Sequence, residues 1–164
     1  MQQKTAHVQP LMGPTAAHER LNALIGAWHT EGRQSDGPIG REAKVTAVDT
    51  YEWLTGHMFV VHRFEGMVGE SPAACIEIIG YDAASDRYPV HTFYNTGITR
   101  TWTLRDDYGN WKLEGDWEIE GRVAQVRCTI NLADNDGTMR SRWECCRDDG
   151  DWIAFWELEA TKVR

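Results

Sequence analysis

The side chains best suited to bind or transform a small molecule are two histidines, one glutamate and one arginine, each set in an apolar stretch. They are His62 in MFVVHRF, Glu77 in CIEIIGYD, His91 in PVHTFYN and Arg100 in ITRTWTL. A histidine and a carboxylate within reach of one substrate can act as general base and general acid. An inward arginine, with an acidic partner, can hold a polar head group. Both interpretations require these side chains to point into one cavity.

A structural role competes with each functional one. A histidine on an apolar face is usually a satisfied core residue, and a buried glutamate and arginine can simply pair with each other. Alternation along a strand places His62 on the same face as Val60 and Phe64, and His91 on the same face as Phe93. These are the polar and aromatic candidates for a cavity wall.

Tryptophan is the strongest indication of a binding cavity. The chain of 164 residues contains eight Trp and five Tyr, and such rings favour strands and binding sites. In NWKLEGDWEI and TMRSRWECC, apolar or small residues alternate with charged ones, which predicts one dry and one wet face. The tryptophans expected to face inward are Trp102, Trp117, Trp143, Trp152 and Trp156. They predict either a solid aromatic core or an aromatic-lined cavity.

Composition and motifs restrict the class of function. A net charge of −8 without any basic run argues against nucleic acid or a membrane surface as partner. The chain has no apolar run of transmembrane length and no signal-peptide core at its start, which favours a cytoplasmic protein. The acidic turns DNDG and DDGD are too short for a calcium loop, and the four cysteines form no metal-binding pattern. We therefore expect neither a metal nor a cofactor.

One short helix and about ten strands are predicted to position these side chains. Leu21, Leu24 and Ile25 repeat at helical spacing after a possible N-cap at Thr15, and Gly26 ends the helix. Turn sequences such as SDGPIG, NTG and DDYGN then recur about every 10 to 14 residues. Antiparallel strands in this rhythm close most simply into an up-and-down barrel, with a two-sheet sandwich as the alternative.

The chain is expected to form one domain. Residues 1–14 show no periodicity and are predicted to be a loose arm, and residues 15–164 a single barrel domain. MFVVHRF and WIAFWEL are apolar on both faces, so their outer side also needs a cover. The helix, the N-terminal arm or a second copy of the chain could provide it, and the last of these predicts a symmetric dimer.

The motif order resembles that of the calycin superfamily, which includes lipocalins, fatty-acid-binding proteins and nitrobindins. HERLNALIGAW places a helix directly before Gly26-x-Trp28, the arrangement in which the helix closes one barrel end and the tryptophan packs there. The resemblance implies that a basic residue of the last strand, Lys162 or Arg164, lies over the Trp28 ring. Nitrobindins hold haem through a histidine near the chain end. Because no histidine follows His91 here, haem is not expected.

The chain is more closely similar to a bacterial lipocalin-like family of unknown function. Over residues 18–117 it has HERLNALIGAW, GHMFVVHRFEG, IIGYDAASDRY and HTFYNTG in the family's order. Phe93 and Asn95 stand where such relatives tend to have Trp-x-Asp, which puts an acid role at position 95 in doubt.

These observations predict a protein that binds a small, mainly apolar or aromatic molecule in a barrel cavity without changing it. The expected cavity residues are His62, Glu77, His91, Phe93, Arg100, Trp102, Trp117, Trp143 and Trp156. The first alternative is a small isomerase, cyclase or dehydratase that uses His91 and Glu77 as acid and base in the same cavity. The second is a homo-oligomeric interaction module. The sequence leaves open whether any catalysis occurs.

Overall fold

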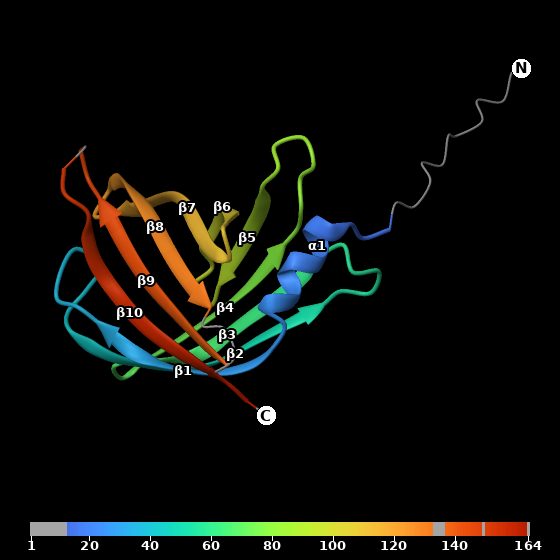
Figure 1. Cartoon of the computed structure of the whole chain (residues 1–164). Coiled ribbons are helices and arrows are strands. Elements are labelled where there is room, and N and C mark those ends of the chain that lie inside the picture. Colours follow the sequence, from blue (N-terminus) through green and yellow to red (C-terminus); the bar gives the residue numbers. More distant parts are fainter. Residues whose placement is uncertain (1–12, 133–136, 149, 164) are drawn as a thin grey trace, which may run out of the picture.

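A closed antiparallel barrel of ten strands makes up most of the chain (Figure 1). The computed structural model describes residues 13–132, 137–148 and 150–163. The strands are β1 (Gly26–Gln34), β2 (Ala43–Trp53), β3 (Val60–Val68), β4 (Ser71–Ile79), β5 (Tyr88–Tyr94), β6 (Thr99–Asp107), β7 (Asn110–Ile119), β8 (Arg122–Leu132), β9 (Thr138–Cys146) and β10 (Ile153–Lys162). Each strand pairs with the next, and β1 pairs with β10, so no sheet edge is left open. The predicted up-and-down barrel is confirmed.

The helix before the barrel is shorter than predicted. The α-helix α1 covers Ala16–Arg20 and continues as the 3-10 turn η1, Leu21–Ala23, instead of reaching residue 25. The Leu24 carbonyl, which is left free where the helix ends, accepts a hydrogen bond of 2.8 Å from the indole N–H of Trp28. Leu21 and Leu24 are 0% and 2% exposed and close this end of the barrel. None of the helical segments in the described ranges is long and apolar enough to cross a membrane.

Gly26 and Trp28 connect the helix to the first strand. Gly26 has a φ of +133°, a conformation that only glycine adopts readily, and a Cβ atom there would lie 2.7 Å from Cε of Lys162. The Lys162 ammonium lies 5.0 Å from the centroid of the Trp28 ring, within the range of a cation–π contact. Arg164, the other basic candidate, lies outside the described residues, as does most of the predicted arm.

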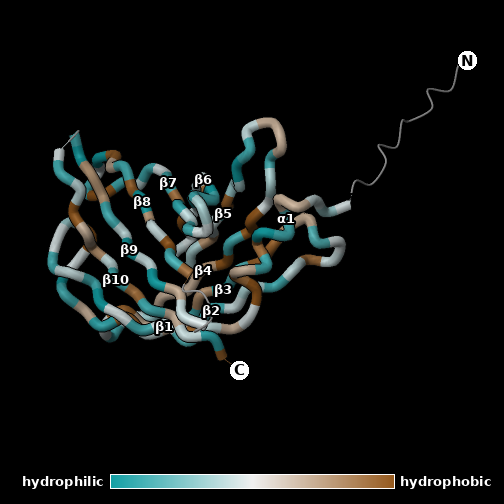
Figure 2. Tube along the Cα trace, in the orientation of Figure 1, coloured by the Kyte–Doolittle hydropathy of each residue, from teal (hydrophilic) through white to brown (hydrophobic). Residues whose placement is uncertain are grey.

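Hydrophobic and hydrophilic residues alternate along most strands (Figure 2), but β10 departs from the pattern. A β-bulge between Ala154 and Trp156 interrupts its pairing with β9. Phe155 is 1% exposed although Trp156 beside it lines the interior, so two consecutive rings face inward. In β3 the outward positions Arg63 and Glu65 are charged and exposed. The outer face of MFVVHRF thus combines Phe59, which is 45% exposed, with the charged Arg63, and its predicted apolar cover stays a prediction.

Candidate functional site

An internal cavity of about 430 Å³ occupies the barrel. Leu24 lies at the helix end of it, whereas Thr96 and Ile98, in and beside the turn after β5, lie at the other end. Because Ile98 is 48% exposed, the cavity reaches the surface there. A volume of this size is typical of sites for small molecules.

One wall of the cavity is aromatic and aliphatic. It comes from β7 to β10 and includes Trp117, Ile130, Trp143, Trp156, Leu158 and Ala160. Trp143 and Trp156 meet edge to face, with ring centroids 6.0 Å apart. This wall offers a planar or apolar ligand ring surfaces rather than hydrogen bonds.

Two of the tryptophans expected at the cavity lie elsewhere. Trp102 is 2% exposed and is not among the lining residues. A Cβ atom at Gly115 would lie 2.6 Å from the Trp102 ring, so the indole packs into the space that this glycine leaves. The Trp152 ring stacks 4.0 Å from the Arg127 guanidinium, away from the lining residues.

The opposite wall carries a row of polar side chains at one level of the barrel. Direct pairing across β2 to β6 aligns Tyr51, His62, Glu77, Thr92 and Arg100. Paired residues on neighbouring strands share a face of the sheet, and this face is the inner one. Four of the five line the cavity, and Thr92 is fully buried. We call these residues the polar row.

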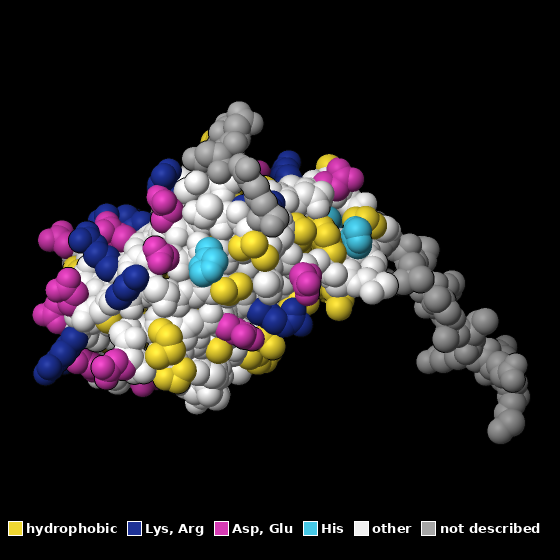
Figure 3. All heavy atoms as spheres, turned by 90° about the horizontal axis from the view of Figure 1, so that it is seen from below, with side chains coloured by type: hydrophobic (Ala, Val, Ile, Leu, Met, Phe, Trp, Pro, Cys, Tyr) yellow, Lys and Arg dark blue, Asp and Glu magenta, His cyan; other side chains and the backbone are white. Residues whose placement is uncertain are grey.

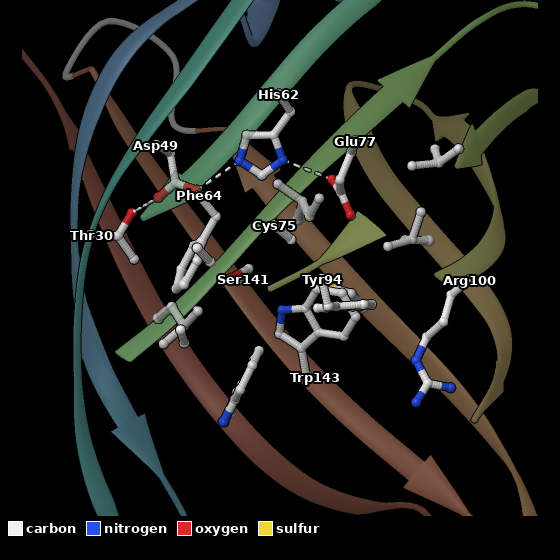
Figure 4. Close-up of a pocket in the computed structure, with 18 of the residues that line it drawn as sticks. Thr30, Asp49, His62, Phe64, Cys75, Glu77, Tyr94, Arg100, Ser141 and Trp143 are labelled. Carbon is white, nitrogen blue, oxygen red and sulfur yellow. Dashed lines mark hydrogen bonds and ion pairs between the residues drawn. The ribbon is translucent and has the colours of Figure 1, made fainter. Parts of the chain in front are cut away.

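His62 is the centre of a hydrogen-bonded network (Figure 4). Its Nδ1 lies 2.7 Å from Oε2 of Glu77, and its Nε2 lies 2.8 Å from Oδ1 of Asp49. Each carboxylate also accepts a hydrogen bond from a hydroxyl on its other oxygen, Glu77 from Thr92 at 2.8 Å and Asp49 from Thr30. Two carboxylates that accept from one ring require a proton on both ring nitrogens, which is the imidazolium form.

The surroundings favour that charged form. Burial opposes it, but the hydrogen bonds to Asp49 and Glu77 outweigh burial and raise the pKa of His62 from 6.5 to about 9. Burial also opposes ionisation of Glu77, yet its bonds to His62 and Thr92 bring its pKa below the usual 4.5. The Tyr51 ring lies parallel to the imidazole with centroids 4.0 Å apart and covers one of its faces. Two carboxylates against one imidazolium leave this part of the wall negative.

Arg100, at the β6 end of the polar row, lines the same cavity (Figure 4). Eight arginines form ion pairs with carboxylates, but Arg100 has none within the described part of the chain. Its guanidinium carbon lies 4.6 Å from the Trp117 ring centroid. Burial lowers the pKa of Arg100, and Tyr94 and Glu118 act against that effect. The side chain remains a cation near neutral pH.

His91 and Phe93, two of the predicted cavity residues, point out of the barrel. Phe93 is 51% exposed, and His91 is also exposed, whereas Thr92 and Tyr94 between and beside them face inward. The sequence left the parity of β5 ambiguous because both of its faces carry large side chains. Glu77 and His91 lie on opposite sides of the barrel wall, so the predicted acid–base pair is wrong.

Three residues of the network, Thr30, Asp49 and Thr92, were not predicted from the sequence. The sequence alone could have indicated one of them, Asp49. In AKVTAVDTYEW, Asp49 lies two positions from both Ala47 and Tyr51, so strict alternation places it on the apolar face. A carboxylate on an apolar face requires a partner, and here the partner is His62.

The network limits what His62 can do chemically. General base catalysis needs a ring nitrogen that is free to accept a proton from the substrate, and both nitrogens of His62 are bonded to carboxylates. Among the residues whose placement is known, no cluster of three or more His, Cys, Asp or Glu side chains is arranged to hold a metal ion. The cavity is thus better suited to hold a ligand than to transfer its protons.

Comparison with known proteins gives the family but no activity. No curated protein matches this chain. The model of one family, described as "Protein of unknown function (DUF1579)", matches residues 13–162, which span the helix and all ten strands. The ten-stranded barrel with its N-terminal helix fits a calycin-like fold. Because the match covers nearly all of the sequence, the chain belongs to the DUF1579 family.

Proposed function

We propose that the protein binds a small, mainly apolar or aromatic molecule in the barrel cavity and does not change it chemically. The observation that carries the proposal is the cavity of about 430 Å³ with an aromatic wall on β7 to β10. The aromatic and aliphatic side chains of this wall present apolar surface to the cavity. A ligand of matching shape would remove that surface from water, which favours binding.

An enzyme in the same cavity has less support. The acid–base pair that the sequence suggested is separated by the barrel wall, since His91 is exposed and Glu77 lines the cavity. The histidine that does line the cavity, His62, has both ring nitrogens in hydrogen bonds. Proton transfer by His62 would require one of these two hydrogen bonds to open during each turnover.

A neutral aromatic probe tests the proposed function. N-phenyl-1-naphthylamine should bind with a rise in its own fluorescence and quench the tryptophan emission. Trp143→Ala removes a ring of the aromatic wall and should weaken probe binding by about two- to tenfold, because one aromatic contact contributes about 0.5–1.5 kcal/mol. Trp152→Ala is the matched control, since this ring stacks on Arg127 outside the lining residues. A folded wild-type protein that binds no apolar probe would contradict the proposal.

We also propose that the protein forms a symmetric dimer. The support is an exposed apolar pair on the outer face of β4 and β5, not the two strands from which the sequence predicted it. Ile76 and Phe93 are paired across β4 and β5 on the outer face and are 42% and 51% exposed. Figure 3 shows that hydrophobic side chains also lie among the charged ones on the outside of the barrel seen from below. A two-fold contact would bury the Ile76–Phe93 pair against its copy. Sedimentation should show a dimer at micromolar concentration and a monomer for Phe93→Glu, and a monomeric wild type would count against it.

A further inference from the structure

The polar row holds two opposite charges apart. Glu77 on β4 and Arg100 on β6 are each paired directly with Thr92 on β5. Neighbouring strands lie about 4.8 Å apart, so the backbones of the two charged residues are roughly 10 Å apart. The Thr92 hydroxyl between them already donates to Glu77 at 2.8 Å and accepts from the Trp102 indole at 3.0 Å. No hydrogen bond or ion pair joins Glu77 to Arg100 among the described residues, so a molecule in the cavity could bridge the two groups.

Arg100 interacts with the Tyr94 hydroxyl, but its guanidinium has no carboxylate partner among the described residues. Its guanidinium carbon lies 4.6 Å from the Trp117 ring centroid and 5.9 Å from that of Tyr94. Stacking on a ring covers one face of the guanidinium but does not use its N–H groups. The Nε atom is buried and has no hydrogen-bond partner among the described residues. A partly buried cation without a counter-ion is unfavourable. An anionic group in the cavity would pair with the Nη groups of Arg100 through charge-assisted hydrogen bonds.

Glu77 presents the opposite requirement. Its side chain is 15% exposed, compared with 9% for His62 and 8% for Asp49, so it is the member of the network most open to the cavity. Each of its oxygens accepts one hydrogen bond, from His62 or Thr92, and can accept another. A ligand hydroxyl or amine could donate there. A second carboxylate could not, because like charges repel.

The facing wall sets the chemistry of the rest of the ligand. Trp143, Trp156 and Leu158 line the cavity on β9 and β10 and offer almost no hydrogen-bonding groups to it. A ligand that lies between the two walls must therefore be polar along one edge and apolar over the remainder.

We infer that the ligand is an organic anion with an apolar or aromatic body, whose anionic group binds Arg100 and whose hydrogen-bond donor faces Glu77. This inference rests on the proposed function, since it assigns polarity and orientation to the same ligand. Arg100 would then recognise the negative charge of the ligand, and Glu77, roughly two strand spacings away, would recognise its hydrogen-bond donor.

Matched probes test the anionic group. We would titrate the protein by calorimetry with 3-(4-hydroxyphenyl)propanoate and with its neutral amide. The acid should bind about tenfold more tightly or better, because hydrogen bonds to charged groups are the stronger ones. Arg100→Gln should remove this preference by weakening the acid alone, and Arg100→Lys should retain part of it. Arg63→Met is the control, since this outward arginine pairs with Glu52, and it should leave both affinities unchanged.

A second pair of probes tests the donor. Compared with 3-phenylpropanoate, which lacks the hydroxyl, the hydroxylated acid should bind several-fold more tightly to wild type. Glu77→Gln should reduce this difference. Circular dichroism would establish that each variant is folded, and should Arg100→Gln not fold, Arg100→Met takes its place.

The outcomes separate the inference from the proposed function. Equal affinity of wild type for acid and amide, or a preference that survives Arg100→Gln, would overturn the anion assignment, while binding of N-phenyl-1-naphthylamine would leave the proposed function standing. An equal affinity for the acids with and without the hydroxyl would overturn the donor assignment. A wild type that binds none of these probes would overturn both proposals.

Discussion

Replacing Trp28 with alanine should lower the free energy of unfolding by about 3–5 kcal/mol, the range measured when a large aromatic core residue is truncated. Trp28 is 2% exposed, and its indole N–H donates to the carbonyl of Leu24 at the end of the helical segment. The substitution removes the packing of the ring, leaves a cavity and frees that carbonyl. It should also loosen Leu24, which closes the cavity at the helix end.

Urea unfolding followed by circular dichroism would measure this loss. Trp152→Ala is the control, since it removes the same side chain from a half-buried position outside the barrel interior and should cost clearly less. Lys162→Met, which removes only the cation over the Trp28 ring, should cost about 0.5–1 kcal/mol. Equal effects of Trp28→Ala and Trp152→Ala would contradict the assignment of Trp28 as a core residue that stabilises the helix end of the barrel.

The fold was predictable because it depends on repeated local patterns. Turn sequences and two-residue alternation recur along the whole chain, so a wrong assignment in one strand does not alter the barrel. The Gly26-x-Trp28 pattern is local as well, since the glycine conformation and the buried indole lie within three residues. Such features need no knowledge of which strands are neighbours.

The site was less predictable because it depends on the register of several strands. His62, Glu77 and Asp49 come from β3, β4 and β2, and only pairing brings their side chains together. Parity fails where both faces of a strand are bulky, as at His91. It also fails at the bulge before Trp156, where one additional residue shifts the alternation.

Replacing His62 with leucine should lower the free energy of unfolding by about 3–5 kcal/mol near pH 6, because it leaves Asp49 and Glu77 buried without their cation. Leucine fits an apolar barrel interior, so the expected loss reflects the unpaired carboxylates rather than a cavity. His29→Leu is the matched control. His29 is exposed on the outer face of β1 and should tolerate the change with an effect within about 0.5 kcal/mol.

The cost of His62→Leu should depend on pH in a defined direction. The pKa of His62 is about 9 in the folded protein and 6.5 when unfolded, so its stabilisation is complete below pH 6.5 and is lost as pH rises through about 9. For Glu77 the pKa is lowered from 4.5, so its contribution is present above pH 4.5 and is lost as pH falls through the lower value. The difference between wild type and variant should therefore be largest between pH 4.5 and 6.5.

Urea unfolding of wild type, His62→Leu and His29→Leu at intervals from pH 5 to 9.5 would test this dependence. The difference between wild type and His62→Leu should shrink by on the order of 2–3 kcal/mol as pH rises from 6.5 past 9. All three proteins keep the buried cysteines, whose raised pKa values also reduce stability at high pH, so that effect cancels in the comparison. A difference that stays constant from pH 6.5 to 9.5 would mean that His62 is neutral in the fold, and one of the two acidic groups would then carry the proton and donate it in a hydrogen bond to the ring.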